Sequence, residues 1–219
     1  MLFHVTSEKR LPKILKNGFN RHELPLSTEY AKEASGIEDE EDEEYFSDCS
    51  ADAQEYLDEE LGRPDSVYFW LSKDRALISK SGLSGLPYKL VILGVNPDKI
   101  PCVCKVSDTD IADEIYYEYY HACMQDIMVD YEKIEELVEK WNETVRTYEP
   151  DKTYPDDHEV WCPCDIPPDA IEKIYDENGN ELCKRDENGL LTCKVEDAIS
   201  WEHKKRFSRG SLIREEEIF

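Results

Sequence analysis

Residues 2–19 read LFHVTSEKRLPKILKNGF, and they predict the first strand and the first helix of the chain. The apolar run at 2–5 is typical of a short β-strand, while Leu11, Ile14 and Leu15 recur at helical spacing. Gly18 follows the last of these residues, as a glycine often does at the end of a helix. We therefore expect a strand, a tight turn and a helix of about three turns.

The polar residues of this stretch are candidates for a binding site. Thr6 or Ser7 is predicted to cap the helix, because a side-chain hydroxyl there can accept a hydrogen bond from a free amide of the first turn. His4 precedes them near the end of the strand, where its ring and the cap could face one pocket. A histidine buried in an ordinary first strand is the alternative.

Composition and charge limit the class of protein. The chain has 219 residues, 40% hydrophobic and 11% aromatic, which is enough for a hydrophobic core, and we expect a single domain over 1–219. The net charge of −25 repels phosphate backbones and disfavours sequence-independent binding of nucleic acid. Because neither a signal peptide nor an apolar run of membrane-spanning length is evident, we expect a cytoplasmic protein without a membrane partner.

An acidic insertion is predicted at about 21–62. Between residues 38 and 60 there are thirteen acidic residues and no lysine or arginine, which is about half of the net charge. Such a run usually marks solvated chain. It is interpreted as a mobile lid, as a docking surface for a basic partner, or as a surface loop with no role.

The remaining pattern predicts an α+β fold with a mostly antiparallel sheet. Strands are expected at 66–71, 88–95, 100–106 and from 159, with a helical segment at about 109–146. Asn-Gly steps at 178–179 and 188–189 predict two hairpin turns, and 195–207 is a possible last helix. The sequence contains neither of the glycine-rich phosphate-binding motifs of dinucleotide-binding and P-loop enzymes.

Three segments together resemble the ADP-ribosyltransferase superfamily. The first is Phe3-His4-Val5-Thr6-Ser7 with the helix that ends at Gly18-Phe19, which is similar to the His-x-Thr opening of that fold. The second is the tyrosine strand Ser66-Val67-Tyr68-Phe69-Trp70, and the third is Glu159-Val160-Trp161 with the Ile166-Pro167-Pro168 that follows. The blocks lie in the order of the family and have some similarity to its branches that act on DNA bases and on RNA 2′-phosphates. Val5 replaces the glycine usual after the histidine.

The resemblance implies a split antiparallel β-sheet core with flanking helices, and NAD as a substrate. Glu159 would stabilise the cationic ribose that forms when the nicotinamide bond breaks, the problem that glycosidases solve with a carboxylate. His4 would bind the ribose on the adenosine side, with Thr6 or Ser7 near the nicotinamide half. Tyr68, beside Phe69, would stack on the nicotinamide ring.

The function expected from the resemblance is transfer of ADP-ribose from NAD to an acceptor that the sequence does not identify: a protein, a nucleic acid or a small molecule. An RNA 2′-phosphotransferase-like activity is an alternative within enzymes. A non-catalytic acidic protein of the same fold, which binds a basic partner through residues 38–60, is the alternative outside them.

Eight cysteines complete the candidate sites. In a cytoplasmic protein they are expected to be thiols or metal ligands rather than disulfides. Cys102 and Cys104 form one Cys-x-Cys pair, and Cys162 and Cys164 form another, so each pair would place both sulfurs on one strand face. On neighbouring strands the two pairs could bind zinc, although buried free thiols are the simpler expectation.

Overall fold

The computed structural model describes residues 1–22, 49, 52–63, 65–79 and 89–193. The predicted helix at 195–207 and the acidic run at 38–44 lie outside this part of the chain. Its helices and its large antiparallel sheet confirm the expected α+β class.

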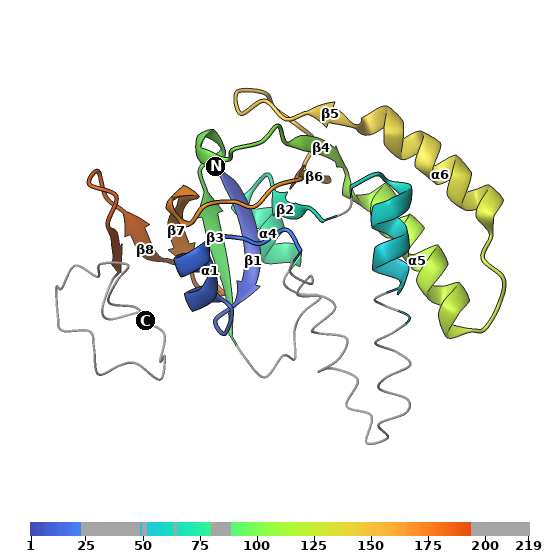
Figure 1. Ribbon diagram of the computed structural model, residues 1–219, viewed down its shortest axis with the longest axis horizontal. Coiled ribbons are helices and arrows are strands. Elements are labelled where there is room, and N and C mark those ends of the chain that lie inside the picture. Colours follow the sequence, from blue (N-terminus) through green and yellow to red (C-terminus); the bar gives the residue numbers. More distant parts are fainter. Residues whose placement is uncertain (23–48, 50–51, 64, 80–88, 194–219) are drawn as a thin grey trace, which may run out of the picture.

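One nine-stranded sheet organises the fold, in the order β5-β4-β6-β2-β1-β3-β7-β8-β9 (Figure 1). Every pair of neighbouring strands is antiparallel. The first strand of the chain lies at the centre, between the second and the third. The strands are β1 Leu2–Ser7, β2 Val67–Trp70, β3 Leu90–Val95, β4 Lys105–Asp108, β5 Arg146–Thr147, β6 His158–Cys162, β7 Ile171–Tyr175, β8 Glu181–Arg185 and β9 Leu191–Cys193.

Helices cover both faces of the sheet. The helix α1 (Leu11–Asn17) packs through its buried leucines and isoleucine on one face, and α4 (Lys73–Ser79) packs on the other. The antiparallel helices α5 (Thr109–Met124) and α6 (Tyr131–Thr144), which fall within the predicted helical segment, lie beside β4 and β6 with the helical residues 52–60 next to them (Figure 1). Short 3-10 turns η2 (Pro97–Lys99) and η3 (Pro168–Ala170) complete the described elements.

Alternation along the strands separates two different cores. In β1 and β2, Leu2, Val67 and Phe69 belong to the large apolar cluster under α1. Their neighbours Tyr68 and, in β6, Trp161 face the helices at 52–60, α5 and α6. Successive side chains of a strand point to opposite faces, so residues adjacent in sequence enter different surroundings.

The predictions of local structure hold with two corrections at element ends. The strand β1 continues through Ser7, and α1 begins after Arg10 without a side-chain cap, so neither predicted hydroxyl caps the helix. With seven residues α1 has about two turns, not the predicted three. Ser7 Oγ instead accepts from the amide of Arg10 at 3.3 Å, within the connecting turn. Gly18 does end the helix; its φ of 78° and the carbonyl of Ile166, which a Cβ there would strike, both require glycine.

The second correction concerns the strand predicted at 100–106, which begins only at Lys105. The residues before it follow Pro101, which has no amide hydrogen for a sheet bond. The two Asn-Gly turns are confirmed, since Gly179 and Gly189 both have φ of 80° between antiparallel strands.

The expectation of free thiols, and with it the zinc site, is wrong. All eight cysteines form disulfides: Cys49–Cys123, Cys102–Cys164, Cys104–Cys162 and Cys183–Cys193. The two Cys-x-Cys pairs lie side by side, but their sulfurs are bonded to each other and offer no thiolate to a metal.

The described part of the acidic insertion is also more ordered than a solvated loop. Leu57 and Leu61 are buried against α5 and α6, and Cys49 is bonded to Cys123 of α5. The last residues of the insertion therefore belong to the packed structure, because their apolar side chains contribute to its second core.

Candidate functional site

Two of the three predicted catalytic residues lie on one face of the sheet. In the pairing of β2 with β6, Trp70 is opposite Glu159 and Tyr68 is opposite Trp161. Directly opposed residues of antiparallel strands share a face, and so do residues two apart on one strand. The side chains of Tyr68 and Glu159 therefore point to the same side, toward the helical residues 52–60, α5 and α6.

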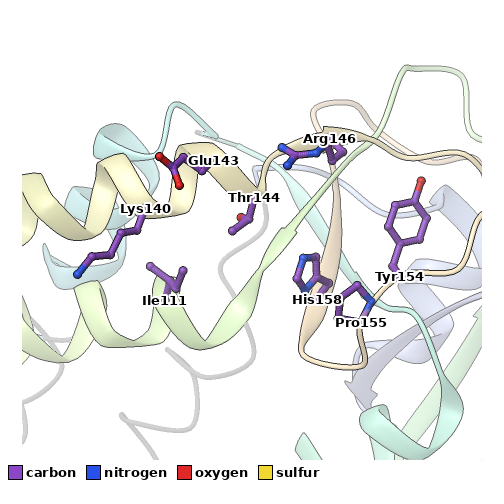
Figure 2. A pocket seen from close by; sticks show the side chains of 8 residues that line it. All are labelled: Ile111, Lys140, Glu143, Thr144, Arg146, Tyr154, Pro155 and His158. Atoms are coloured by element: carbon purple, nitrogen blue, oxygen red, sulfur yellow. The ribbon is translucent and has the colours of Figure 1, made fainter.

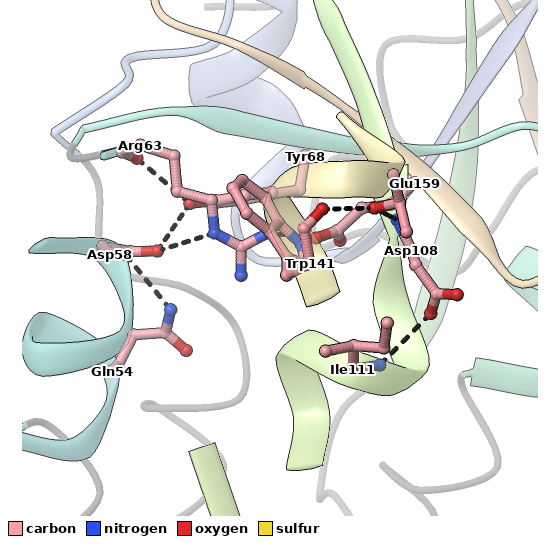
Figure 3. A network of polar contacts seen from close by, with 9 residues as sticks. Gln54, Asp58, Arg63, Tyr68, Asp108, Ile111, Trp141 and Glu159 are labelled. Carbon is pink, nitrogen blue, oxygen red and sulfur yellow. Dashed lines mark hydrogen bonds and ion pairs between the residues drawn. The ribbon is translucent and has the colours of Figure 1, made fainter. Parts of the chain in front are cut away.

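An arginine that follows those helical residues joins this pair into a buried polar network (Figure 3). The guanidinium of Arg63 donates to Glu159 Oε1 and lies 3.3 Å from Asp58 Oδ1. The hydroxyl of Tyr68 donates to the same Asp58 oxygen at 2.8 Å. Arg63 and Glu159 are only 4% and 8% exposed, so this is an ion pair inside the protein.

Aromatic rings enclose the guanidinium. The Arg63 Cζ lies 4.9 Å from the ring centre of Tyr68 and 5.7 Å from that of Trp141 in α6. A cation over an aromatic face is stabilised by the ring quadrupole, more strongly where water is excluded. The network thus consists of one cation, two carboxylates and the phenol of Tyr68, with the guanidinium between the Tyr68 and Trp141 rings.

Burial and charge act on the ionisable groups of the network. Burial raises the pKa of Asp58 above its ordinary value, although Arg63 and the hydroxyl of Tyr68 oppose this shift. Burial would lower the pKa of Arg63, but the nearby Glu159 carboxylate outweighs it and the pKa is raised. Burial also raises the pKa of Tyr68 well above its usual range. Arg63 therefore remains a cation, and Tyr68 a neutral hydrogen-bond donor.

Asp113 of α5 is a further carboxylate, and the charge of Glu159 affects its pKa. Asp113 is exposed at the surface, but partial desolvation by the surrounding protein, followed by the charge of Glu159, raises its pKa to about 6. A carboxyl group whose pKa is raised toward neutrality is suited to general acid–base catalysis.

The structure does not bring the side chain of His4 into this network. Phe3 is opposite Trp70, so His4 faces the other side of the sheet, where its ring packs on Phe19 and Phe69 with centroids at 4.8 and 5.8 Å. Its Nδ1 is 2.9 Å from the carbonyl oxygen of Tyr68, which is the contact between the two predicted residues.

The other predicted cofactor-binding residues divide in the same way. Thr6 and Phe69 are buried on the face of His4, and Ser7 is buried on the opposite face. The structure therefore groups Tyr68 with Glu159, and separates both from His4, Thr6 and Phe69.

A groove of about 610 Å³ lies elsewhere, between the end of α6 and the start of β6 (Figure 2). Its lining includes Lys140, Arg146 and His158. Beside it Asp108, Asp157 and His158 lie close enough to share a metal ion. However, Asp108 already accepts from the amide of Ile111, and Asp157 is paired with His158 at 2.9 Å, so local contacts explain the cluster.

Sequence reasoning missed Arg63 and Asp58. Asp58 is one of thirteen similar acidic residues, and Arg63 belongs to a turn sequence that gave no sign of burial. The available signal was that Arg63 is the first basic residue after the acidic run, next to apolar Leu57 and Leu61.

The comparisons with known proteins identify no family: no family model, no curated protein and no solved structure matches this chain. Among the described residues, no helix combines the length and apolarity needed to cross a bilayer.

Proposed function

We propose that the protein is an NAD-dependent ADP-ribosyltransferase whose reaction takes place on the Tyr68–Glu159 face of the sheet. The proposal starts from the resemblance of the three sequence blocks. The structural observation that carries it is the convergence of Tyr68 and Glu159 on one face, around a buried cation. Burying charged groups costs several kcal/mol each, so a site function is one reason to retain them.

The chemistry assigned to Glu159 needs an ionised carboxylate near the ribose of NAD. Breaking the bond to nicotinamide develops positive charge on the ribose, and a fixed negative group stabilises that charge. In the free protein Arg63 donates to Oε1 of this carboxylate. Tyr68 offers a ring face for the nicotinamide, and Asp113, with a pKa of about 6, is suited to accept a proton from the acceptor.

The experiment compares the native chain with Glu159→Gln, which keeps the size of the side chain and loses its charge. We expect nicotinamide release from NAD to fall about 10²-fold or more, ~3 kcal/mol, as for other preorganised electrostatic groups. The dissociation constant of NAD, measured by calorimetry, should change by less than about 1 kcal/mol, since the lost interaction belongs to the transition state. Equal turnover by the two proteins would remove Glu159 from the mechanism.

A second candidate function is favoured by the ion pair itself. Arg63 and Asp58 satisfy Glu159 and Tyr68 within the protein, as they would in a non-catalytic domain that binds a basic partner. That candidate predicts no heat with millimolar NAD, and binding to a basic protein that weakens as salt is added. An RNA 2′-phosphotransferase-like enzyme would instead act on RNA 2′-phosphates.

The cytoplasmic location stays a prediction, and the disulfides weigh against an ordinary reducing cytosol. Disulfides persist in secreted proteins and other oxidising compartments, and also in the cytosol of hyperthermophiles. We propose that the protein works in one of these settings.

A further inference from the structure

We infer that Arg63 is a diphosphate-binding residue, which pairs with Glu159 in the free protein and exchanges that partner for the diphosphate of NAD. This inference rests on the proposed function. It assigns to the cation of the network a role in recognising the substrate, and it explains how Glu159 becomes available to the ribose.

The position of Arg63 supports the exchange. Its guanidinium is the cation that contacts both predicted site residues, Glu159 through Oε1 and Tyr68 through the ring face. A protein of net charge −25 that binds an anionic dinucleotide needs a local cation at the site. A guanidinium is suited to this because its planar N–H groups match the geometry of phosphate oxygens.

The charge balance explains why a phosphate must replace the carboxylate. A buried guanidinium that simply lost Glu159 would leave an uncompensated charge, at a cost of several kcal/mol. A ligand can shift the position of Arg63 only if it favours the displaced state. NAD favours the displaced state for two reasons. Its diphosphate gives Arg63 a new negative partner, and its ribose hydroxyl forms a hydrogen bond with Glu159.

Arg63 stands in the turn that ends an anchored helical segment. The helical residues 52–60 are held by the Cys49–Cys123 disulfide and by buried Leu57 and Leu61. Arg63 follows Gly62, which has φ of 60° and no atom within 4 Å of where a Cβ would stand. The backbone amide of Arg63 donates a hydrogen bond to the carbonyl of Asp58 at 2.9 Å, and this bond ends the helical segment.

Polar atoms that lack a hydrogen-bond partner within the described part of the chain surround the network and favour the entry of a polar ligand. Ser107 Oγ, Trp141 Nε1 and Trp161 Nε1 are buried and have no hydrogen-bond partner among the residues that the structure describes. Ser107 is directly opposite Glu159 in the β4–β6 pairing, and the rings of Trp141 and Trp161 are 6.3 Å apart. Buried polar groups are normally satisfied, so these groups can gain hydrogen bonds when a polar ligand enters.

The first test is calorimetry on full-length variants with three probes: NAD, ADP and nicotinamide. Arg63→Gln should weaken NAD and ADP by about 10- to 100-fold, the value of a hydrogen bond to a charged group. Nicotinamide, which carries no phosphate, should bind equally to both proteins, and this separates the role of Arg63 from general damage to the fold. Arg146→Gln removes an exposed arginine on β5 and should leave all three affinities unchanged.

Amide hydrogen exchange, measured on the native chain, tests the change of partner at Arg63 without a substitution that could prevent folding. ADP should speed exchange of the Arg63 amide by loosening its bond to Asp58, whereas nicotinamide alone should not. If the native chain binds NAD, and Arg63→Gln binds NAD and ADP as tightly as native, the inference is overturned while the proposed function stands. Slower exchange at Arg63 with ADP would also overturn it. If the native chain binds no NAD, both fail.

Discussion

The two faces of the adjacent strands β1, β2 and β6 carry different kinds of side chain. On the α1 side, His4, Phe19 and Phe69 form edge-to-face aromatic contacts within the large apolar core. On the other side, Tyr68 and Glu159 meet a buried arginine and a second carboxylate. The difference shows that one strand can serve stability through one residue and a candidate site through the next. It follows that variants on the two faces should have separable effects.

The largest expected effect is on the stability of the apolar face. Phe69→Ala removes a 1% exposed ring from the core and should lower the free energy of unfolding by about 3 to 5 kcal/mol, through lost contacts and the cavity left behind. Urea denaturation followed by circular dichroism measures it. The exposed Ile78 is the control, since Ile78→Ala should cost less than about 0.5 kcal/mol. Similar costs for both would show that this face is not a packed core.

A smaller effect is expected from His4→Ala, which tests how the faces divide. The variant loses a hydrogen bond to the carbonyl of Tyr68 and a ring contact with Phe19, which together are worth about 1 to 2 kcal/mol of stability. Its affinity for NAD should match the native value within about 1 kcal/mol, because the ring faces away from Glu159. A strong loss of NAD affinity in a folded variant would restore the ribose-binding role implied by the sequence resemblance.

The smallest effect concerns the pH dependence of stability on the Glu159 side. The pKa of Asp113 is about 6 in the folded protein against an ordinary value of 3.8, so the folded state binds this proton more tightly. The stability that the proton provides is fully present below about pH 4 and is lost as the pH rises through about 6.

Asp113→Asn should therefore melt a few degrees above the native chain at pH 7.5, and the difference should vanish near pH 4. Asp151→Asn, which alters an exposed carboxylate away from Asp113, serves as the control in the same scans. A constant difference between Asp113→Asn and native at both pH values would show that this carboxyl group does not titrate as described.

The sequence predicted most of the described elements but not the composition of the site. Strands, helices and hairpin turns follow from periodicity and from the Asn-Gly steps, which are local signals. Whether His4 and Tyr68 lie on the same face of the sheet depends on the register between β1 and β2. A shift of one residue in that register would move His4 to the other face. Local patterns do not specify that register, so the grouping of His4 with Glu159 could not be checked before the strands were paired.

Arg63 illustrates a second limit of the sequence. A charged residue in a turn is normally exposed, and burial becomes favourable here only because Glu159, ninety-six positions away, supplies the opposite charge. The cysteines show a third limit, since the Cys-x-Cys spacing left open whether the two pairs lie next to each other. Bond formation between the pairs depended on a redox setting that the spacing does not reveal.

The paired bridges near β4 and β6 have a use of their own. Lys105 is opposite Trp161 in the pairing of β4 with β6. The same antiparallel alignment, continued before β4, places Cys104 opposite Cys162 one residue further on and Cys102 opposite Cys164 three residues further on, and both pairs are bonded. Eight cysteines allow 105 connectivities, yet a slip of two residues between these strands would bring Cys102 opposite Cys162 instead. A proteolytic peptide map that identifies which cysteines are joined therefore determines the register of these strands by chemical means.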